Sequence, residues 1–480
     1  MNVSCIGLGP ALNIQTPQIP HYHMIKKNLK RDKELTSGPI TPKVLSLTGP
    51  LMVIAILNST LHLIDMFWVG KLGKDSIAAV AIGGTIMMVV FATLIGLTRG
   101  TVALVSRYVG AKDTKNADAA ASQSIVLGLI IALAAILVGL LFTDKLLLIL
   151  GASPEVLKIG SSYLKILLVG GITMVLLYFG NSILQAEGDT VTPMKFMFLS
   201  NIINIILDPI FIFGLGTIPR METSGAALAT VLSQAIPACL VLILLYTRRS
   251  KVHIHISQFK IKLAFLKEMI KIGLPASLQM FFRSIMGVVL MGIVASFGTV
   301  AVAAYGIGMR LQMVVLMPAF AFGGAAATLV GQNLGARKSK RAQRSAWTAT
   351  SLDMIIMAFV AILFFIFAPQ IVGFFTKDKN IISLGTEFLR VTAPFYLFIP
   401  LGVVLGQALA GAGDTTAPMF ITLLSLWGFQ VPMAIFLSRV WGVSGIWWAN
   451  AFASILHGIL VMSWFTTGRW KKRELQSIME

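Results

Sequence analysis

Two aspartates stand out in this sequence because they lie inside long apolar segments. Asp65 occurs in ILNSTLHLIDMFWVG and Asp208 occurs in NIINIILDPIFIFG. In a membrane, a charge at such a depth is costly unless it faces a cavity or finds a partner. The corresponding apolar segments in the second half of the chain contain no acid. The two residues therefore predict a proton or cation site in one half of the molecule.

Polar residues at helical spacing accompany these acids. Asn204 is four residues before Asp208, so both side chains share one helix face. Ala226 and Thr230 are also four residues apart in the next apolar segment. Two carboxylates in a low-dielectric site cannot both stay ionised cheaply, so we expect their protons to come off as a coupled pair. Carboxylate, amide and hydroxyl oxygens would also bind Na⁺, and the sequence leaves the choice between H⁺ and Na⁺ open.

The composition indicates the elements that must position these residues. Of the 480 residues, 56% are hydrophobic and only 12% are charged, and the mean hydropathy is +0.84. A soluble protein of this size would carry more charge on its surface. Repeated apolar runs of about 20 residues or more match the thickness of a bilayer core. We predict an all-α polytopic membrane protein with twelve spans, at about 44–69, 77–104, 121–143, 160–185, 193–215, 224–247, 265–296, 300–330, 346–369, 384–410, 417–438 and 443–467.

The distribution of basic residues predicts the orientation in the membrane. Most of the net charge of +20 lies in the tails and in alternate connections, at Lys26, Lys27, Lys30, Arg31, Lys33, Arg248, Arg249, Lys251, Lys260, Lys262, Lys267, Arg337, Lys338, Lys340, Arg341, Arg344, Arg469, Lys471, Lys472 and Arg473. The opposite connections carry only scattered basic residues. By the positive-inside rule, both termini and the loop at 248–264 are expected to be cytoplasmic. Because these charges flank spans, they argue against nucleic-acid binding.

The two ends of the chain carry little further information. Residues 1–43 lack the apolar core of a cleavable signal, and we expect a disordered cytoplasmic tail there. Met24 opens a basic segment that would suit a natural start, so the place of residues 1–23 in the mature protein stays open. Cys5, in this tail, and Cys239, inside the sixth span, are not expected to form a disulfide. Residues 468–480 are expected to form a second cytoplasmic tail.

An internal repeat at a spacing of 225 residues organises the whole chain. Four blocks keep this offset: TGP at 48–50 with GLP at 273–275, LGKDSIAAVAIGG at 72–84 with FGTVAVAAYGIGM at 297–309, VSRYVGAKDTK at 105–115 with VGQNLGARKSK at 330–340, and QAEGDTVTPM at 185–194 with AGAGDTTAPM at 410–419. Each repeat holds six spans, an even number, so the two halves share one orientation. We therefore expect two six-helix lobes, at 44–247 and 265–467, joined by the basic loop at 248–264.

At this point the residues resemble a known family. The doubled six-helix plan, the paired GAxxxK and GDTxxPM blocks, and the NxxxDP segment at Asn204, Asp208 and Pro209 resemble the multidrug and toxic compound extrusion (MATE) transporters. Asp65, with no acid in the seventh and eighth spans, is similar to their prokaryotic DinF-like branch. The resemblance implies a secondary antiporter in a prokaryotic plasma membrane. It would act as a monomer and export amphipathic, often cationic compounds in exchange for H⁺ or Na⁺, with no cofactor besides that ion.

The resemblance also implies roles for single residues. In that branch, a group of side chains in the N-terminal lobe is hydrogen-bonded together. The matching residues of this sequence are Asp65, Asn204, Asp208, Tyr163 and Thr230, with Ala226 one helical turn before Thr230. The same branch places substrate contacts at the positions of Asn58, Asn181 and Met197. Pro50, in the first span, would allow that helix to bend, because a proline lacks one helix hydrogen bond.

Three further residues keep two interpretations each. His62, three residues before Asp65, would either take part in proton transfer or be an ordinary packed histidine. Arg283 and Arg310 fall inside spans of the second half, where a basic side chain must face water, snorkel or pair. If Arg283 faces a central cavity, it would disfavour strongly cationic compounds and admit zwitterions or anions.

Other classes of function remain alternatives. A flippase for lipid-linked oligosaccharide or another amphiphilic lipid shares the two-lobed plan, but such proteins usually carry additional C-terminal spans. An enzyme is not expected, because the sequence has no HExxH, GxSxG, paired-histidine or DxD pattern. A channel is not expected either, because no repeated filter loop occurs.

Overall fold

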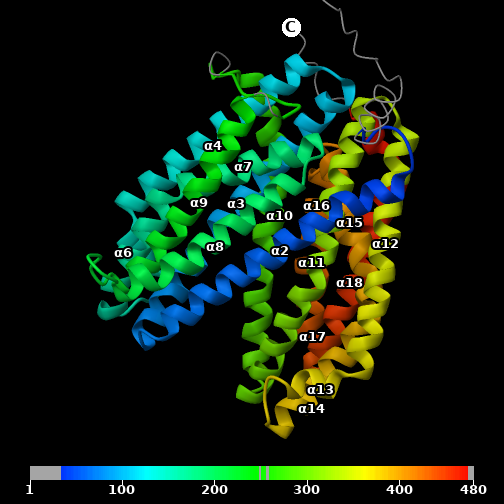
Figure 1. The fold of residues 1–480 in the computed structure, drawn as a ribbon. Helices are drawn as coiled ribbons and strands as arrows, with labels where there is room; N and C mark the ends of the chain where they lie inside the picture. Colours follow the sequence, from blue (N-terminus) through cyan, green and yellow to red (C-terminus); the bar gives the residue numbers. More distant parts are fainter. Residues whose placement is uncertain (1–33, 248–249, 256–258, 474–480) are drawn as a thin grey trace, which may run out of the picture.

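The computed structural model describes residues 34–247, 250–255 and 259–473, and within these ranges every regular element is a helix (Figure 1). The first half contains α2 (Ile40–Gly70), α3 (Lys74–Ala111), α4 (Thr114–Leu141), α5 (Thr143–Ile149), α6 (Pro154–Gly170), α7 (Ile172–Glu187), α8 (Val191–Phe213) and α9 (Glu222–Tyr246). The second half contains α10 (Leu263–Ala295), α11 (Thr299–Gly335), α12 (Ser339–Ile366), α13 (Ala368–Gly373), α14 (Lys379–Thr392), η2 (Ala393–Phe398), α15 (Ile399–Gly411), α16 (Thr416–Leu423), η3 (Leu424–Gln430), α17 (Val431–Trp441), α18 (Ser444–Thr466) and η4 (Arg469–Lys472).

The helices that are long and apolar enough to cross a membrane confirm the predicted fold class. In the described part of the chain there are 11 such helices, and the pair α6 and α7 makes a twelfth span with a bend of 42°. The bend lies at Gly171, between the two helices. The tenth and eleventh spans are also composite, because η2 and η3 interrupt them. Prolines at 394 and 400 lie at the first of these interruptions, where they remove helix hydrogen bonds.

The segment before the first helix is packed against the second half of the chain. Leu35 is buried, and the side chains of Lys338 and Arg341 donate hydrogen bonds to the carbonyl oxygens of Thr36 and Ser37. Of the disordered tail expected at 1–43, residues 34–43 are ordered and α2 already begins at Ile40. Residues 1–33, including Cys5 and Met24, lie outside the described residues, as do Arg248, Arg249 and the C-terminal residues after Arg473.

The repeat is visible in the backbone itself. Left-handed φ angles are rare for residues other than glycine and mark tight turns. Three pairs of residues with a left-handed φ angle are 225 positions apart. They are Gly73 (109°) and Gly298 (94°), Lys112 (62°) and Arg337 (57°), and Gly188 (96°) and Gly413 (80°). The same turns therefore begin or end the corresponding helices in both halves, as expected for a duplicated unit.

The first helix of each half begins on the opposite lobe. Val44 and Leu47, at the start of α2, belong to a buried cluster with residues of α11, α12 and α15. Phe265 and Met269, at the start of α10, belong to a buried cluster with residues of α3, α4 and α7. Further along, α2 packs against α8 and α10 packs against α16. These two helices therefore connect the lobes physically.

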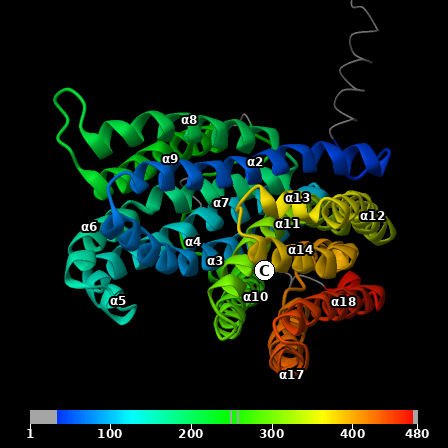
Figure 2. The same ribbon diagram turned by 90° about the horizontal axis from the view of Figure 1, so that it is seen from below.

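The lobes converge at one end of the bundle and diverge toward the other (Figures 1 and 2). The end where they meet, called the basic end here, carries Lys251, Lys338, Arg341 and Arg473, which lie at or beside contacts between the two halves of the chain, and Arg337, which follows α11. Close contact there depends on glycine, since a Cβ placed at Gly100 of α3 would lie 2.4 Å from the carbonyl oxygen of Met269 in α10. Toward the opposite end, the helices of the two lobes run apart (Figure 1).

Candidate functional site

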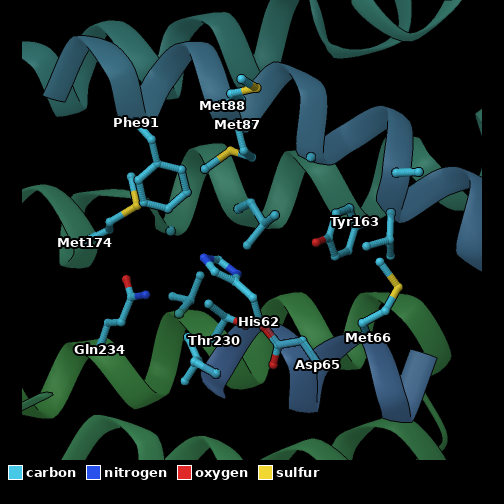
Figure 3. Close-up of a pocket in the computed structure, with 18 residues that line it drawn as sticks. His62, Asp65, Met66, Met87, Met88, Phe91, Tyr163, Met174, Thr230 and Gln234 are labelled. Atoms are coloured by element: carbon cyan, nitrogen blue, oxygen red, sulfur yellow. The ribbon is translucent and has the colours of Figure 1, made fainter. Parts of the chain in front are cut away.

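A cavity of about 440 Å³ lies inside the N-terminal lobe, between α2, α3, α6, α7 and α9. Figure 3 shows His62 and Asp65 on α2 reaching this cavity, with Tyr163 and Thr230 beside it. Most of the remaining wall is apolar and includes the side chains of Met66, Val80, Met87, Met88, Phe91, Leu167, Met174 and Val231. A carboxyl group on such a wall has few competing partners, so it can interact strongly with an ion.

The two aspartates predicted from sequence meet at this site. Asp65 lies close enough to Asp208 and Asn204 for its side chain to interact with theirs, because α2 packs against α8. The Asn204 amide donates to Asp208 Oδ1 at 3.3 Å, one helical turn apart on α8. Asp208 and Asn204 are fully buried. The structure therefore brings together three residues from two distant segments.

The hydrogen bonding of this group is incomplete. Asp65 Oδ1, Asp208 Oδ2 and Asn204 Oδ1 are buried and have no donor among the described residues. A carboxylate can only accept hydrogen bonds, so two carboxylates facing each other need a proton on one of them or a cation between them. Such a site can take up and release a proton, and its oxygen atoms are of the type that Na⁺ prefers.

The remaining predicted members of the group lie close by. Tyr163 on α6 and Thr230 on α9 line the same cavity as Asp65. The Thr230 hydroxyl donates to the carbonyl oxygen of Ala226 at 3.0 Å, which leaves its oxygen free to accept. Gly225 permits this placement, because a Cβ there would lie 2.4 Å from the carbonyl oxygen of Phe211 on α8. The involvement of Tyr163, Thr230 and Ala226 in ion binding stays a prediction.

The predicted substrate contacts are elsewhere in the lobe. Asn58, Asn181 and Met197 do not line the 440 Å³ cavity. Asn181 on α7 is half-buried, and its amide oxygen has no partner among the described residues. Met197 on α8 is buried, and its carbonyl oxygen accepts from Asn201 at 2.9 Å. Their role as substrate contacts stays a prediction, as does bending at Pro50, which lies inside the continuous helix α2.

The structure adds two charged residues that were not predicted from the sequence, Arg99 and Asp353. Arg99 on α3 and Arg283 on α10 line one small cavity between the lobes. Asp353 on α12 is fully buried in the C-terminal lobe, and neither of its carboxyl oxygens has a partner among the described residues. The available signal was the one that identified Asp65, a charge within an apolar span. Arg310, by contrast, is exposed.

Comparison with known proteins supports the two-lobed interpretation. A family model described as MatE matches residues 50–210 and again residues 275–436. Multidrug export protein MepA of Staphylococcus aureus is 28% identical over 429 residues, covering 88% of this chain and 93% of that protein. The FAD transporter of Shewanella oneidensis is 27% identical, covering 88% and 94%. A solved structure of an outward-facing multidrug resistance MATE family transporter of the MOP superfamily matches with a TM-score of 0.85 and 28% identity, covering 92% of this chain and 98% of the other.

Proposed function

This chain belongs to the MATE family of multidrug efflux transporters, and from that premise we propose that it exports amphipathic compounds in exchange for H⁺ or Na⁺. The observation that carries the proposal is the contact of Asp65 with Asp208 and Asn204, where three buried oxygen atoms lack a donor. The ion would bind there, and no other cofactor is needed. The named cargo of the relatives differs between drugs and FAD, so family membership leaves the charge of the substrate open.

Coupling requires only that the ion and the substrate favour opposite arrangements of the lobes. The helix α2 is suited to transmit this preference, because it begins on the C-terminal lobe and carries Asp65 into the N-terminal lobe. Pro50 lies between these two parts of α2 and removes a helix hydrogen bond there. We therefore place the movement that links ion binding to lobe rearrangement in this helix.

The direction of transport follows from the basic end. If the positive-inside rule holds, the basic end is cytoplasmic, and the lobes of this structure diverge toward the exterior. Ion uptake from the exterior would then accompany substrate release. Moving one charge through 100 mV supplies about 2.3 kcal/mol, which corresponds to roughly a fortyfold substrate gradient.

The test is dye transport by the purified protein in proteoliposomes, with a pH gradient or a Na⁺ gradient imposed separately. Two xanthene dyes of opposite net charge, rhodamine 6G as the cation and sulforhodamine B as the anion, should be compared. We expect one gradient to drive transport of at least one dye, and Asp208→Asn or Asp65→Asn to reduce it at least tenfold. Asp144→Asn is the matched control, because Asp144 is exposed on α5 of the same lobe.

The opposite result would be movement of neither dye under either gradient in wild type and variants alike. That outcome would contradict ion-coupled efflux and would favour the flippase alternative. Gradient-driven transport that survives both aspartate substitutions would instead place the coupling site outside the N-terminal lobe.

A further inference from the structure

Two arginines from different helices face one cavity where the lobes meet. Arg99 of α3 and Arg283 of α10 line a space of about 50 Å³, together with two amide side chains, Gln279 and Gln407. Gln279 is held in place by donating to Thr422 Oγ1 at 2.8 Å and to the carbonyl oxygen of Pro418 at 3.3 Å. Two guanidinium groups and two amides therefore line this cavity inside the membrane-spanning part of the protein.

Neither arginine is neutralised by the protein. Within the described ranges, no carboxylate forms an ion pair with Arg99 or Arg283, and neither guanidinium donates a hydrogen bond. No aspartate or glutamate lines the cavity. A guanidinium stays ionised in proteins, and a charge inside a span is costly without a partner. Two positive charges in one cavity also repel each other, so the site favours an anion.

An adjoining cavity in the C-terminal lobe supplies an apolar surface. It has a volume of about 140 Å³ and shares Arg283 and Val403 with the first. Its wall is formed mainly by hydrophobic side chains, namely Met286, Leu290, Tyr305, Met309, Leu316, Phe398, Ile399 and Leu426. The amides of Gln312, Gln430 and Asn450 and the imidazole of His457 provide a few polar contacts. An apolar wall with a few hydrogen-bonding groups is typical of a small-molecule site.

The two cavities together match one kind of molecule. We propose that the substrate is an amphipathic organic anion whose negative group is bound between Arg99 and Arg283 and whose apolar body lies in the C-terminal cavity. This inference rests on the proposed function of the chain as an exporter and names the class of its substrate. Carboxylate, sulfonate and phosphate groups all suit paired guanidinium groups, because their oxygens accept two parallel hydrogen bonds. The carboxylate pair of the N-terminal lobe lies outside both cavities, so ion and substrate have separate sites of opposite charge.

The experiment is equilibrium binding without any gradient. Full-length protein in nanodiscs of zwitterionic lipid is titrated with sulforhodamine B, net charge −1, and with rhodamine 6G, net charge +1, and binding is followed by fluorescence anisotropy against empty nanodiscs. We expect wild type to bind sulforhodamine B more tightly than rhodamine 6G. Arg99→Gln and Arg283→Gln should each weaken sulforhodamine B binding by about tenfold or more, as for loss of a charge-assisted hydrogen bond. Binding of rhodamine 6G should stay the same or tighten.

Two further variants make the result specific. Arg283→Lys keeps the charge but not the planar guanidinium, and it should retain part of the affinity for sulforhodamine B. Arg439→Gln removes the same charge from an exposed position on α17 and should change neither dye. The comparison of the two dyes in wild type decides the question even if a Gln variant fails to fold.

Tighter binding of rhodamine 6G to wild type, with sulforhodamine B unaffected by both Gln substitutions, would overturn the proposal. Other results distinguish failure of the anion site from failure of the proposed antiport function. Arginine-dependent binding of sulforhodamine B without transport under either gradient would contradict antiport and leave the anion site standing. Gradient-driven transport of rhodamine 6G, without arginine-dependent binding of sulforhodamine B, would contradict the anion site alone.

Discussion

Asp65, Asp208 and Asp353 each have a buried carboxyl oxygen that lacks a donor among the described residues, but their surroundings differ. Asp65 and Asp208 reach each other, and Asp65 lines a 440 Å³ cavity from which an ion can arrive. Asp353 lines neither that cavity nor the two at the arginines, and both of its oxygens lack a partner. Burial alone is therefore not the basis of the coupling site proposed above, which rests on a pair of acids beside a cavity.

This difference predicts the effect of removing the Asp353 carboxyl group. A buried polar group without partners lowers stability, so an apolar residue of similar size should be better tolerated. We expect Asp353→Leu to raise the free energy of unfolding by about 1–3 kcal/mol and to leave dye transport within about twofold of wild type. The thermal unfolding midpoint in detergent and transport in proteoliposomes measure the two effects. Lost transport with an intact fold would instead make Asp353 a second ion-binding residue.

The sequence could identify charged residues in spans but not their partners. Asp65 and Asp208 were recognisable because each is an acid in an apolar run, and Asn204 followed from its helical spacing. The contact between Asp65 and Asp208 depends on the packing of α2 against α8, which no local pattern encodes. The same limit applies to Arg283, whose spacing gives no hint that Arg99 of another helix lines the same cavity.

At the scale of elements, the spans were predictable and their irregularities were not. Hydropathy places each span with bounds at most seven residues from those of the helices, because the bilayer requires about 20 apolar residues. The bend at Gly171 and the interruptions at η2 and η3 leave the hydropathy unchanged. The turn residues were more informative, since the GDT blocks of the two repeats both begin with a left-handed glycine, Gly188 and Gly413.

Contact between α3 and the second half of the chain depends on glycines whose missing side chains allow backbones to touch. In Gly100→Leu, the new Cβ would lie 2.4 Å from the carbonyl oxygen of Met269, which is too close for two atoms that are not bonded. The substitution should therefore separate the lobes at the basic end. In a protein lacking its natural cysteines, a cysteine introduced at buried Ser106 reports this opening. We expect Gly100→Leu to increase the alkylation rate of this cysteine by about tenfold or more. A tenfold increase corresponds to a loss of about 1.4 kcal/mol in the free energy that keeps the cysteine closed to the reagent.

Gly292→Leu is the matched control for this measurement, because a Cβ at that position of α10 meets no atom within 4 Å. It should leave the alkylation rate unchanged. An unchanged rate in Gly100→Leu as well, with the protein folded, would show that the basic end does not depend on this close approach.

For the whole molecule, the closed end is built from contacts related by the repeat. A Cβ at Gly110 would lie 1.9 Å from the carbonyl oxygen of Gln332, and a Cβ at Gly335, 225 residues later, would lie 1.9 Å from that of Arg107. Two side chains also form hydrogen bonds between the halves in both directions. Arg107 donates to the carbonyl oxygen of Ala412 at 2.9 Å, and Gln332 donates to the carbonyl oxygen of Ala186 at 2.8 Å. The two donors, Arg107 and Gln332, thus stand at equivalent positions of the repeat, and their acceptors are one residue away from equivalence.

These reciprocal contacts must separate if substrate is to enter from the basic end, because alternating access closes one side of the binding site while the other is open. Ser106 and Gly331 are also 225 residues apart, and a Cβ at Gly331 would lie 2.9 Å from that of Ser106. This distance is within about 1 Å of the Cβ separation in disulfides. In a protein without its natural cysteines, Ser106→Cys combined with Gly331→Cys should form a disulfide under oxidation and abolish dye transport. Dye binding should persist, and reduction should restore transport to at least half of the wild-type rate. Each single cysteine should be insensitive to oxidation, and undiminished transport by a fully cross-linked protein would mean that the lobes do not part at this end.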